Sequence, residues 1–188
     1  MNLETFLVTL LPEHCLIIAL VLLLGIDIVA RRPRGAAEVT LALVAASAVA
    51  AAWLYAQGMT GSPFGDQFIV DPATSLAKAV VLALAVPVVL LAKDEFVDSR
   101  FYTLLVSSLY GICLIVSSGS FLTLFLGLEI MSLPVYVLVL LAYHRPASAE
   151  AALKYLVLSG TASATFLMGA SFRSTPGRRM PTRPPASP

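Results

Sequence analysis

The sequence predicts an all-α, polytopic membrane protein with about six transmembrane helices. Of its 188 residues, 59% are hydrophobic and only 12% are charged, and the mean hydropathy is +0.90. This composition excludes an ordinary soluble domain. Several apolar runs are long enough to cross a hydrocarbon core about 30 Å thick. The expected helices span residues 11–30, 37–57, 74–92, 101–118, 120–143 and 149–171, and together they form one membrane domain over residues 1–171.

Several functional classes are disfavoured by what the sequence contains. The formal net charge is +1, and no dense basic patch of the kind found in nucleic-acid-binding proteins is present. Cys15 and Cys113 both lie in apolar runs, where a free thiol behaves as a small hydrophobic side chain. The sequence shows neither a cysteine cluster nor a pair of axial histidines, so we expect no iron–sulfur or haem site in this chain.

The first two runs have the features of true membrane spans. Residues 11–30 end abruptly at arginines 31, 32 and 34, which argues against a cleaved signal peptide. We expect Asp27 to pair with these arginines. The second run, 37–57, carries Trp53 and Tyr55 at its far end, which is typical of an interfacial aromatic anchor. Residues 58–71 are predicted to form a loop because glycine and proline interrupt regular structure there.

The third and fourth runs each contain one informative pattern. Lys78 lies near the start of run 74–92, where it either extends to the membrane interface or is buried for a functional reason. In run 101–118, Thr103, Ser107 and Gly111 are four residues apart. This spacing places small side chains on one helical face and predicts a close contact with a neighbouring helix.

The fifth run, 120–143, places a carboxylate inside the membrane. With a rise of about 1.5 Å per residue, Glu129 lies roughly 14 Å into this helix, close to the centre of the bilayer. Ionisable groups at this depth are costly and usually functional. Ser132 and Tyr136 follow at i+3 and i+7, so the three residues form a polar stripe that should face protein or water. Pro134 removes one backbone hydrogen bond from this helix.

The sixth run, 149–171, begins at a helix-start signal around Ser148. Lys154, Thr161 and Thr165 follow an i, i+7, i+11 pattern and form a second one-sided polar stripe. Lys154 either extends to the cytoplasmic interface or takes part in function.

Lysines and arginines predict the orientation of the helices. They fall in alternate loops, so the positive-inside rule places the N-terminus on the outer face. Residues 172–188 break this pattern because they are rich in Arg and Pro on the side that should be poor in Arg. We expect a disordered segment that results from a frameshift or an aberrant end; the alternative is a native disordered tail.

Two blocks carry a resemblance to a known family. GLEIMSLPVYVL (127–138) and SAEAALKYLVLSG (148–160) resemble the antiporter-like membrane subunits of respiratory complex I, and the N type of the bacterial NADH:quinone oxidoreductase is the most similar. Weaker support comes from Pro12-Glu13 and from the segment Asp71 to Lys78. The resemblance covers residues 1–171 and corresponds to the N-terminal portion of such a subunit.

The resemblance implies a proton-translocating function. Glu129 and Lys154 would carry proton translocation, and a polar axis comprising Ser132, Tyr136, Lys78 and Thr161 would support them. Burial disfavours an ionised carboxylate whereas a nearby ammonium favours it, so a lysine that approaches or retreats would switch Glu129 between proton release and proton binding.

The resemblance also implies the setting. Complete members have about fourteen helices with two inverted five-helix repeats, so this chain would be a truncated antiporter-like bundle that does not complete a proton path alone. NADH, FMN, iron–sulfur clusters and quinone would be bound by other subunits, with no cofactor in this chain. Its partners would be other membrane subunits of complex I and the lipid bilayer of the bacterial inner membrane, with no nucleic acid.

Three other readings remain open. The chain could belong to a multisubunit cation/proton antiporter, it could be a non-transporting truncated remnant with only a packing role, or it could be an unrelated six-helix protein.

Overall fold

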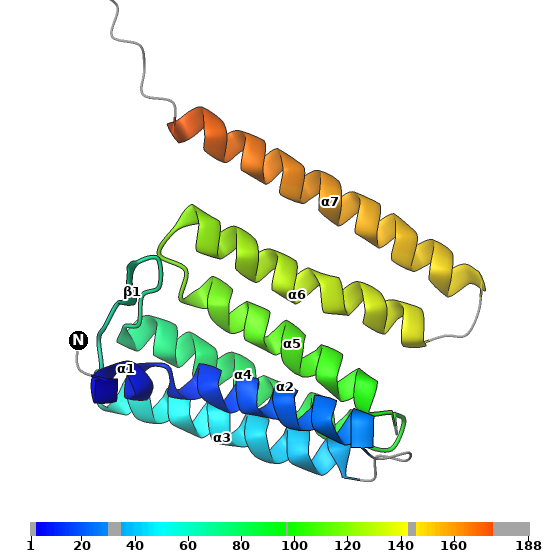
Figure 1. The fold of residues 1–188 in the computed structure, drawn as a ribbon, viewed down its shortest axis with the longest axis horizontal. Coiled ribbons are helices and arrows are strands. Elements are labelled where there is room, and N and C mark those ends of the chain that lie inside the picture. The colour runs from blue at the N-terminus through cyan, green and yellow to red at the C-terminus, as the bar shows by residue number, and fades with distance from the viewer. Residues whose placement is uncertain (1–2, 30–34, 97, 143–145, 175–188) are drawn as a thin grey trace, which may run out of the picture.

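The structure is a computed structural model that describes residues 3–29, 35–96, 98–142 and 146–174. Most of these residues are helical (Figure 1). Six of the described helices are long and apolar enough to cross a membrane, so the predicted all-α membrane fold is confirmed. The elements are α1 (Leu3–Thr9), α2 (Leu11–Val29), α3 (Ala36–Ala56), β1 (Pro63–Asp66), α4 (Pro72–Ala92), α5 (Ser99–Val116), α6 (Phe121–Ala142) and α7 (Pro146–Ser174).

Helices α2 to α5 form a four-helix bundle that contains the main core. Helix α2 packs against α3 and α5, and α3 packs against α4. Because lipid tails are as apolar as leucine, close packing and polar contacts hold such helices together in a membrane. The buried side chains at the centre of the bundle include Leu16, Leu23, Val44, Leu82, Tyr102, Val106 and Cys113.

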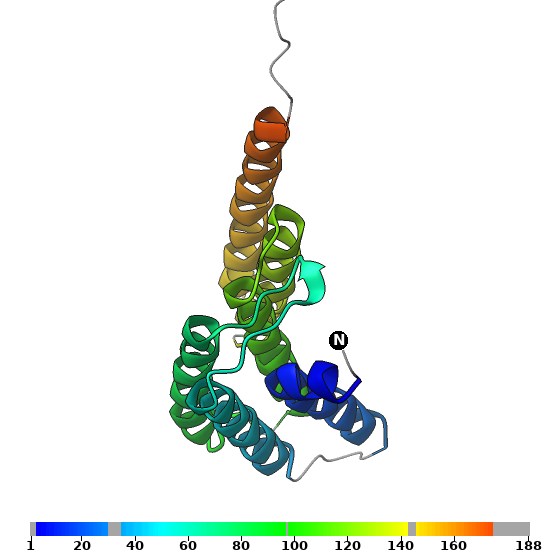
Figure 2. The same cartoon turned by 90° about the vertical axis from the view of Figure 1, so that its left-hand side faces the viewer.

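Helices α6 and α7 extend the bundle from its α5 side (Figure 2). Helix α6 packs along α5, and α7 packs along α6. The ring of Phe121 on α6 stacks on Phe166 of α7 with 4.1 Å between centroids. The other sides of α7 are largely exposed in the described part of the chain.

The contact between α5 and α6 is unusually close at two glycines. A Cβ atom on Gly111 would collide with the backbone of Met131, and one on Gly127 would lie 2.8 Å from Ile115 Cγ1. Ser108 Oγ donates a hydrogen bond to the Met131 carbonyl at 3.2 Å. The predicted close helix contact at Gly111 is therefore present, and Ser108 adds a hydrogen bond to it.

The segment between α3 and α4 is more ordered than the predicted loop. It contains the short strand β1 and an antiparallel bridge between Gly61 and Val70. The Ile69 amide donates to the Ser117 carbonyl at 2.8 Å. The bond from Ile69 joins the segment to the connection between α5 and α6. The pattern of apolar runs in the sequence did not predict these contacts.

One further expectation is corrected at the end of α7, and one about Asp27 is not tested. Helix α7 continues to Ser174, so residues 172–174 are helical and were wrongly assigned to the tail; residues 175–188 lie outside the described residues. Asp27 accepts a hydrogen bond from Ser99 at 2.8 Å and lies 3.8 Å from Arg100. Arginines 31, 32 and 34, its expected partners, also lie outside the described residues, so this pairing stays a prediction.

Candidate functional site

Glu129 lies in the middle of α6 and faces α7. Its carboxylate is partly buried, and Oε1 accepts a hydrogen bond from Ser163 Oγ at 2.5 Å. Ser132, which the sequence placed on the same stripe, donates to the Glu129 backbone carbonyl at 3.4 Å. The carboxylate is thus held between two membrane-spanning helices by a hydroxyl group, which can both donate and accept a hydrogen bond.

A small cavity lies between α6 and α7 and is lined by Ser163, the hydrogen-bond partner of Glu129. Its volume is about 210 Å³, and a water molecule occupies about 30 Å³ in the liquid. Three of the lining residues, Ser132, Ser159 and Ser163, carry hydroxyl groups. The cavity therefore has the space and some of the polar groups needed to hold water against Ser163, which is hydrogen-bonded to Glu129. Its remaining lining residues are Leu128, Met131, Ala162 and Phe166.

Tyr136 completes the predicted stripe on α6 but does not contact the carboxylate. It is 7% exposed, and its hydroxyl group has no hydrogen-bond partner among the described residues. Its ring lies 5.6 Å from that of Tyr155 on α7. An unpaired buried hydroxyl group is costly, so the Tyr136 hydroxyl favours a polar partner beyond the described residues.

Lys154 does not meet Glu129 in this structure. Its side chain is 71% exposed, and Nζ lies 2.5 Å from Glu150 Oε1 in the same helix. Thr161 is also exposed and bonds the carbonyl of Leu158. Because successive residues are about 100° apart on a helix, Ser163 lies on the side of α7 opposite Thr161. The polar stripe of Lys154 and Thr161 therefore faces away from α6.

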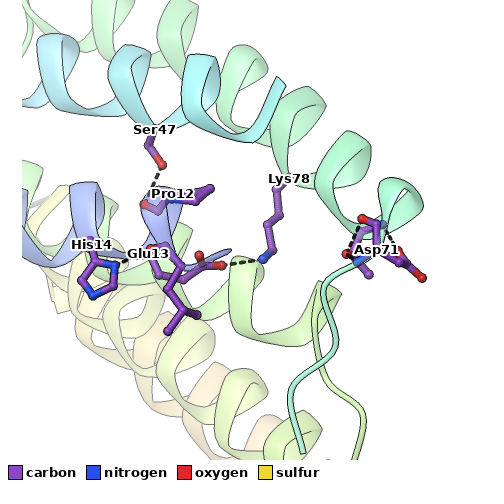
Figure 3. A network of polar contacts seen from close by, with 8 residues as sticks. Pro12, Glu13, His14, Ser47, Asp71 and Lys78 are labelled. Carbon is purple, nitrogen blue, oxygen red and sulfur yellow. Dashed lines mark hydrogen bonds and ion pairs between the residues drawn. The ribbon is translucent and has the colours of Figure 1, made fainter. Parts of the chain in front are cut away.

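A second ionisable pair is buried between α2 and α4 (Figure 3). Lys78 Nζ lies 2.5 Å from Glu13 Oε1, and the two side chains are only 1% and 5% exposed. The ammonium also lies 4.9 Å from the centroid of the Phe68 ring. Lys78 is thus buried and ion-paired, and the alternative in which it extends to the interface is wrong.

Local sequence explains how Lys78 reaches this position. Asp71 caps α4 by accepting a 2.7 Å hydrogen bond from the Thr74 amide, and Pro72 occupies the first turn. From this fixed start, Ser75, Lys78 and Leu82 recur at helical spacing on the buried face. On α2, the Pro12 carbonyl accepts a 2.8 Å bond from Ser47 of α3, next to Glu13 (Figure 3).

Sequence reasoning did not identify Glu13 as the partner of Lys78. The two residues are 65 positions apart. One feature of the sequence could have indicated this pair: Glu13 and Lys78 carry opposite charges, and each lies near the N-terminal end of an apolar run. Within the described ranges, no group of three or more His, Cys, Asp and Glu residues is placed to hold a metal ion.

Comparisons with known proteins bear directly on α6 and α7. Residues 118–174 match the model of a family described as NADH:quinone oxidoreductase/Mrp antiporter, transmembrane region. The NADH-quinone oxidoreductase subunit N of Neisseria gonorrhoeae is 39% identical over 168 residues, which cover 86% of this chain and 35% of that protein. The subunit N of Laribacter hongkongensis is 34% identical, with coverage of 86% and 34%. The predicted resemblance to the antiporter-like N subunits of complex I is confirmed.

A solved structure agrees with this resemblance to subunit N. A chain of respiratory complex I from Thermus thermophilus, solved with bound aureothin, matches with a TM-score of 0.76 and 28% identity. The match covers 86% of this chain and 36% of that one. The chain thus spans about one third of the length of the subunit N relatives reported above.

The matched family region contains both residues that the sequence singled out for proton translocation. Glu129 and Lys154 fall within residues 118–174. The structure brings Glu129 together with Ser163 and places Lys154 beside Glu150. Ser163 was not among the residues singled out from the sequence, although it lies only two positions from Thr161.

Proposed function

We propose that this chain takes part in proton translocation in the membrane arm of a bacterial NADH:quinone oxidoreductase. The observation that carries this proposal is the Glu129 carboxylate, which lies midway along a membrane-spanning helix and is bonded to Ser163 of the next helix. An acid in the hydrocarbon region is costly and usually marks an ion or proton pathway.

The geometry suits a group that binds and releases a proton. Ser163 can donate to the ionised carboxylate and can accept from the protonated acid, so both states of Glu129 keep a partner. Water in the cavity of about 210 Å³ that Ser163 lines would bring or remove the proton through this hydroxyl group. A nearby cation favours the ionised state. Lys154, on the exposed side of α7, would act toward a helix that packs there in the assembled complex.

The partners follow from the same proposal. Other membrane subunits of the complex would cover the exposed sides of α7, and NADH, FMN, iron–sulfur clusters and quinone would be bound elsewhere in the complex. The chain would lie in the inner membrane with its N-terminus on the outer face, as the distribution of Lys and Arg predicts.

A second candidate is a subunit of a multisubunit cation/proton antiporter. The description of the matched family names both NADH:quinone oxidoreductase and Mrp antiporter. The relatives reported above carry the name of the oxidoreductase subunit, and this favours the first candidate.

Assembly and transport measurements separate these candidates. We expect an affinity-tagged chain, expressed from its own locus, to migrate in native gels with NADH-oxidising activity, and deletion of the gene to remove NADH-driven proton pumping from inverted vesicles. Sodium-dependent proton exchange that persists without NADH and is lost on deletion would indicate the antiporter instead. Deletion that changes neither activity would contradict both and favour a packing role.

A further inference from the structure

The buried pair of Glu13 and Lys78 is separate from the Glu129 site. Glu129 faces α7 through Ser163, whereas Glu13 and Lys78 lie between α2 and α4, near the end of the bundle where both helices begin (Figure 3). An ion pair is a weak source of stability when it is this deeply buried, because both charges lose their hydration. Ionisable residues within membrane-spanning segments are usually functional.

The two oxygens of the Glu13 carboxylate have different environments. Oε1 is 2.5 Å from Lys78 Nζ. Oε2 is buried and has no hydrogen-bond partner among the described residues. Buried polar atoms are almost always hydrogen-bonded to protein or water, so this oxygen has a free acceptor position in a side chain that is 5% exposed.

Glu13 also lines a cavity of about 400 Å³ between α2, α5, α6 and the segment after α3. Most of the wall is apolar, but His14, Gln67, Tyr110 and Thr123 add polar groups to it. Since each water occupies about 30 Å³ and needs two or more polar partners, the cavity has room for a short chain of water molecules that reaches Glu13.

We propose that Glu13 and Lys78 form a second intramembrane proton-exchange site, which is reached by water through this cavity. In the exchange step, a hydrated proton adds to Oε2 of Glu13 and forms an O–H bond, and a water molecule is left behind. Lys78 keeps its protons and its charge throughout. The reverse step returns the proton to water and restores the ion pair.

Other titratable groups surround this site on several elements. His14 lies on α2, and its Nδ1 donates a hydrogen bond to the Leu10 carbonyl at 2.7 Å. Tyr110 and Cys113 lie on α5 and Cys15 lies on α2, and Tyr110 lines the same cavity as Glu13. Glu13 is the carboxylate among them, so infrared spectroscopy can separate its protonation from theirs.

The test uses the whole 188-residue chain in lipid nanodiscs and records infrared spectra as the pH is lowered. All proteins carry Glu129→Gln, so that the carboxylate of α6 adds no band, and we expect Glu13 to give a carboxylic acid C=O band at the high frequency typical of an apolar site. This band should disappear in Glu13→Gln and persist in Glu38→Gln, a matched control whose carboxylate pairs with Lys93 at 3.5 Å on the surface. Spectra of Glu13→Gln that equal the spectra of the protein with Glu13 would overturn the proposal.

A second pair of variants covers the case in which Glu13→Gln does not fold. The double variant Glu13→Gln, Lys78→Met removes both charges, keeps similar volumes and leaves no unpaired ammonium. It should fold and lack the same band. If the folded double variant keeps the band, the proton resides elsewhere and the proposal is wrong.

A cavity-filling variant tests the route to Glu13. Leu126→Trp places a large ring in the cavity wall, and we expect it to slow the deuterium shift of the Glu13 band several-fold after transfer to heavy water. Leu122→Trp, on the same helix at a position that is 59% exposed, should leave the exchange rate unchanged. Equal rates in all three proteins would overturn the role of the cavity.

Discussion

Ser163 on α7 donates a 2.5 Å hydrogen bond to the carboxylate of Glu129 on α6. The two residues are 34 positions apart, and the bond links the helix with the intramembrane acid to the outermost described helix. Under the proposed function, this bond would couple the protonation of Glu129 to the position of α7.

Replacing Ser163 by Ala should weaken the contact between α6 and α7. Hydrogen bonds between membrane helices contribute on average about 0.6 kcal/mol and at most about 1.7 kcal/mol, so we expect a loss of roughly 1 kcal/mol in the free energy of unfolding. Denaturation in mixed micelles measures this loss. Thr165→Val is the control, because Thr165 bonds the carbonyl of Thr161 within its own helix, and a loss of equal size there would contradict the assigned role.

Replacing Gly111 by Ala should force α5 and α6 apart. The added Cβ would collide with the backbone of Met131, which cannot move as a flexible side chain can. Overpacking of this kind costs about 1–3 kcal/mol. Gly160→Ala on α7 is the matched control: no atom lies within 4 Å of its added Cβ, so this variant should be neutral or slightly stabilising. Equal unfolding free energies for the two variants would be inconsistent with the close contact.

Breaking the pair of Glu13 and Lys78 from one side should be more damaging than removing it whole. Lys78→Met leaves a buried, unpaired carboxylate and should cost about 3–5 kcal/mol, whereas replacing both charges by neutral groups of similar volume is often close to neutral. The unfolding free energies of Lys78→Met and of the double variant with Glu13→Gln measure the difference. If Lys78→Met alone is as stable as the wild type, the pair is not buried in the way described.

Much of the fold could be predicted because it depends on local patterns. The length and polarity of each apolar run predicted the six candidate spans, and the small residue Gly111 predicted a close helix contact. The pairings across the segment before α4 could not be predicted in this way. They join backbone groups such as the Ile69 amide and the Ser117 carbonyl, which carry no side-chain signal.

The site was predicted less completely, since it depends on which helix faces meet. Glu129 stood out because a carboxylate in an apolar run is rare, but its partner Ser163 did not, because serine is common in membrane helices. Lys154 pairs with Glu150 at i+4, a spacing that the sequence displays. Glu13 and Lys78 meet only because α2 and α4 both begin at the same end of the bundle, which is a tertiary property.

Replacing Lys154 by Ala should reduce proton pumping less than replacing Glu129. The lysine is 71% exposed and pairs with Glu150, and an exposed i,i+4 pair contributes only about 0.3–0.5 kcal/mol, so the chain should remain stable. NADH-driven pumping in inverted vesicles measures the effect. Lys93→Ala, which breaks a comparable surface pair with Glu38, should pump at the wild-type rate; equal losses in both variants would argue against a specific role for Lys154.

The most direct test of the proposed function is NADH-driven proton pumping by inverted membrane vesicles that carry Glu129→Gln. The amide keeps the shape of the side chain and can bond Ser163, but it cannot bind and release a proton. We predict that pumping and the coupled quinone-reductase rate both fall strongly while the complex stays assembled. Glu129→Asp should lower both rates less. The control Glu38→Gln, at a position 68% exposed, should leave both rates unchanged. Pumping by Glu129→Gln at the wild-type rate would contradict the role of Glu129.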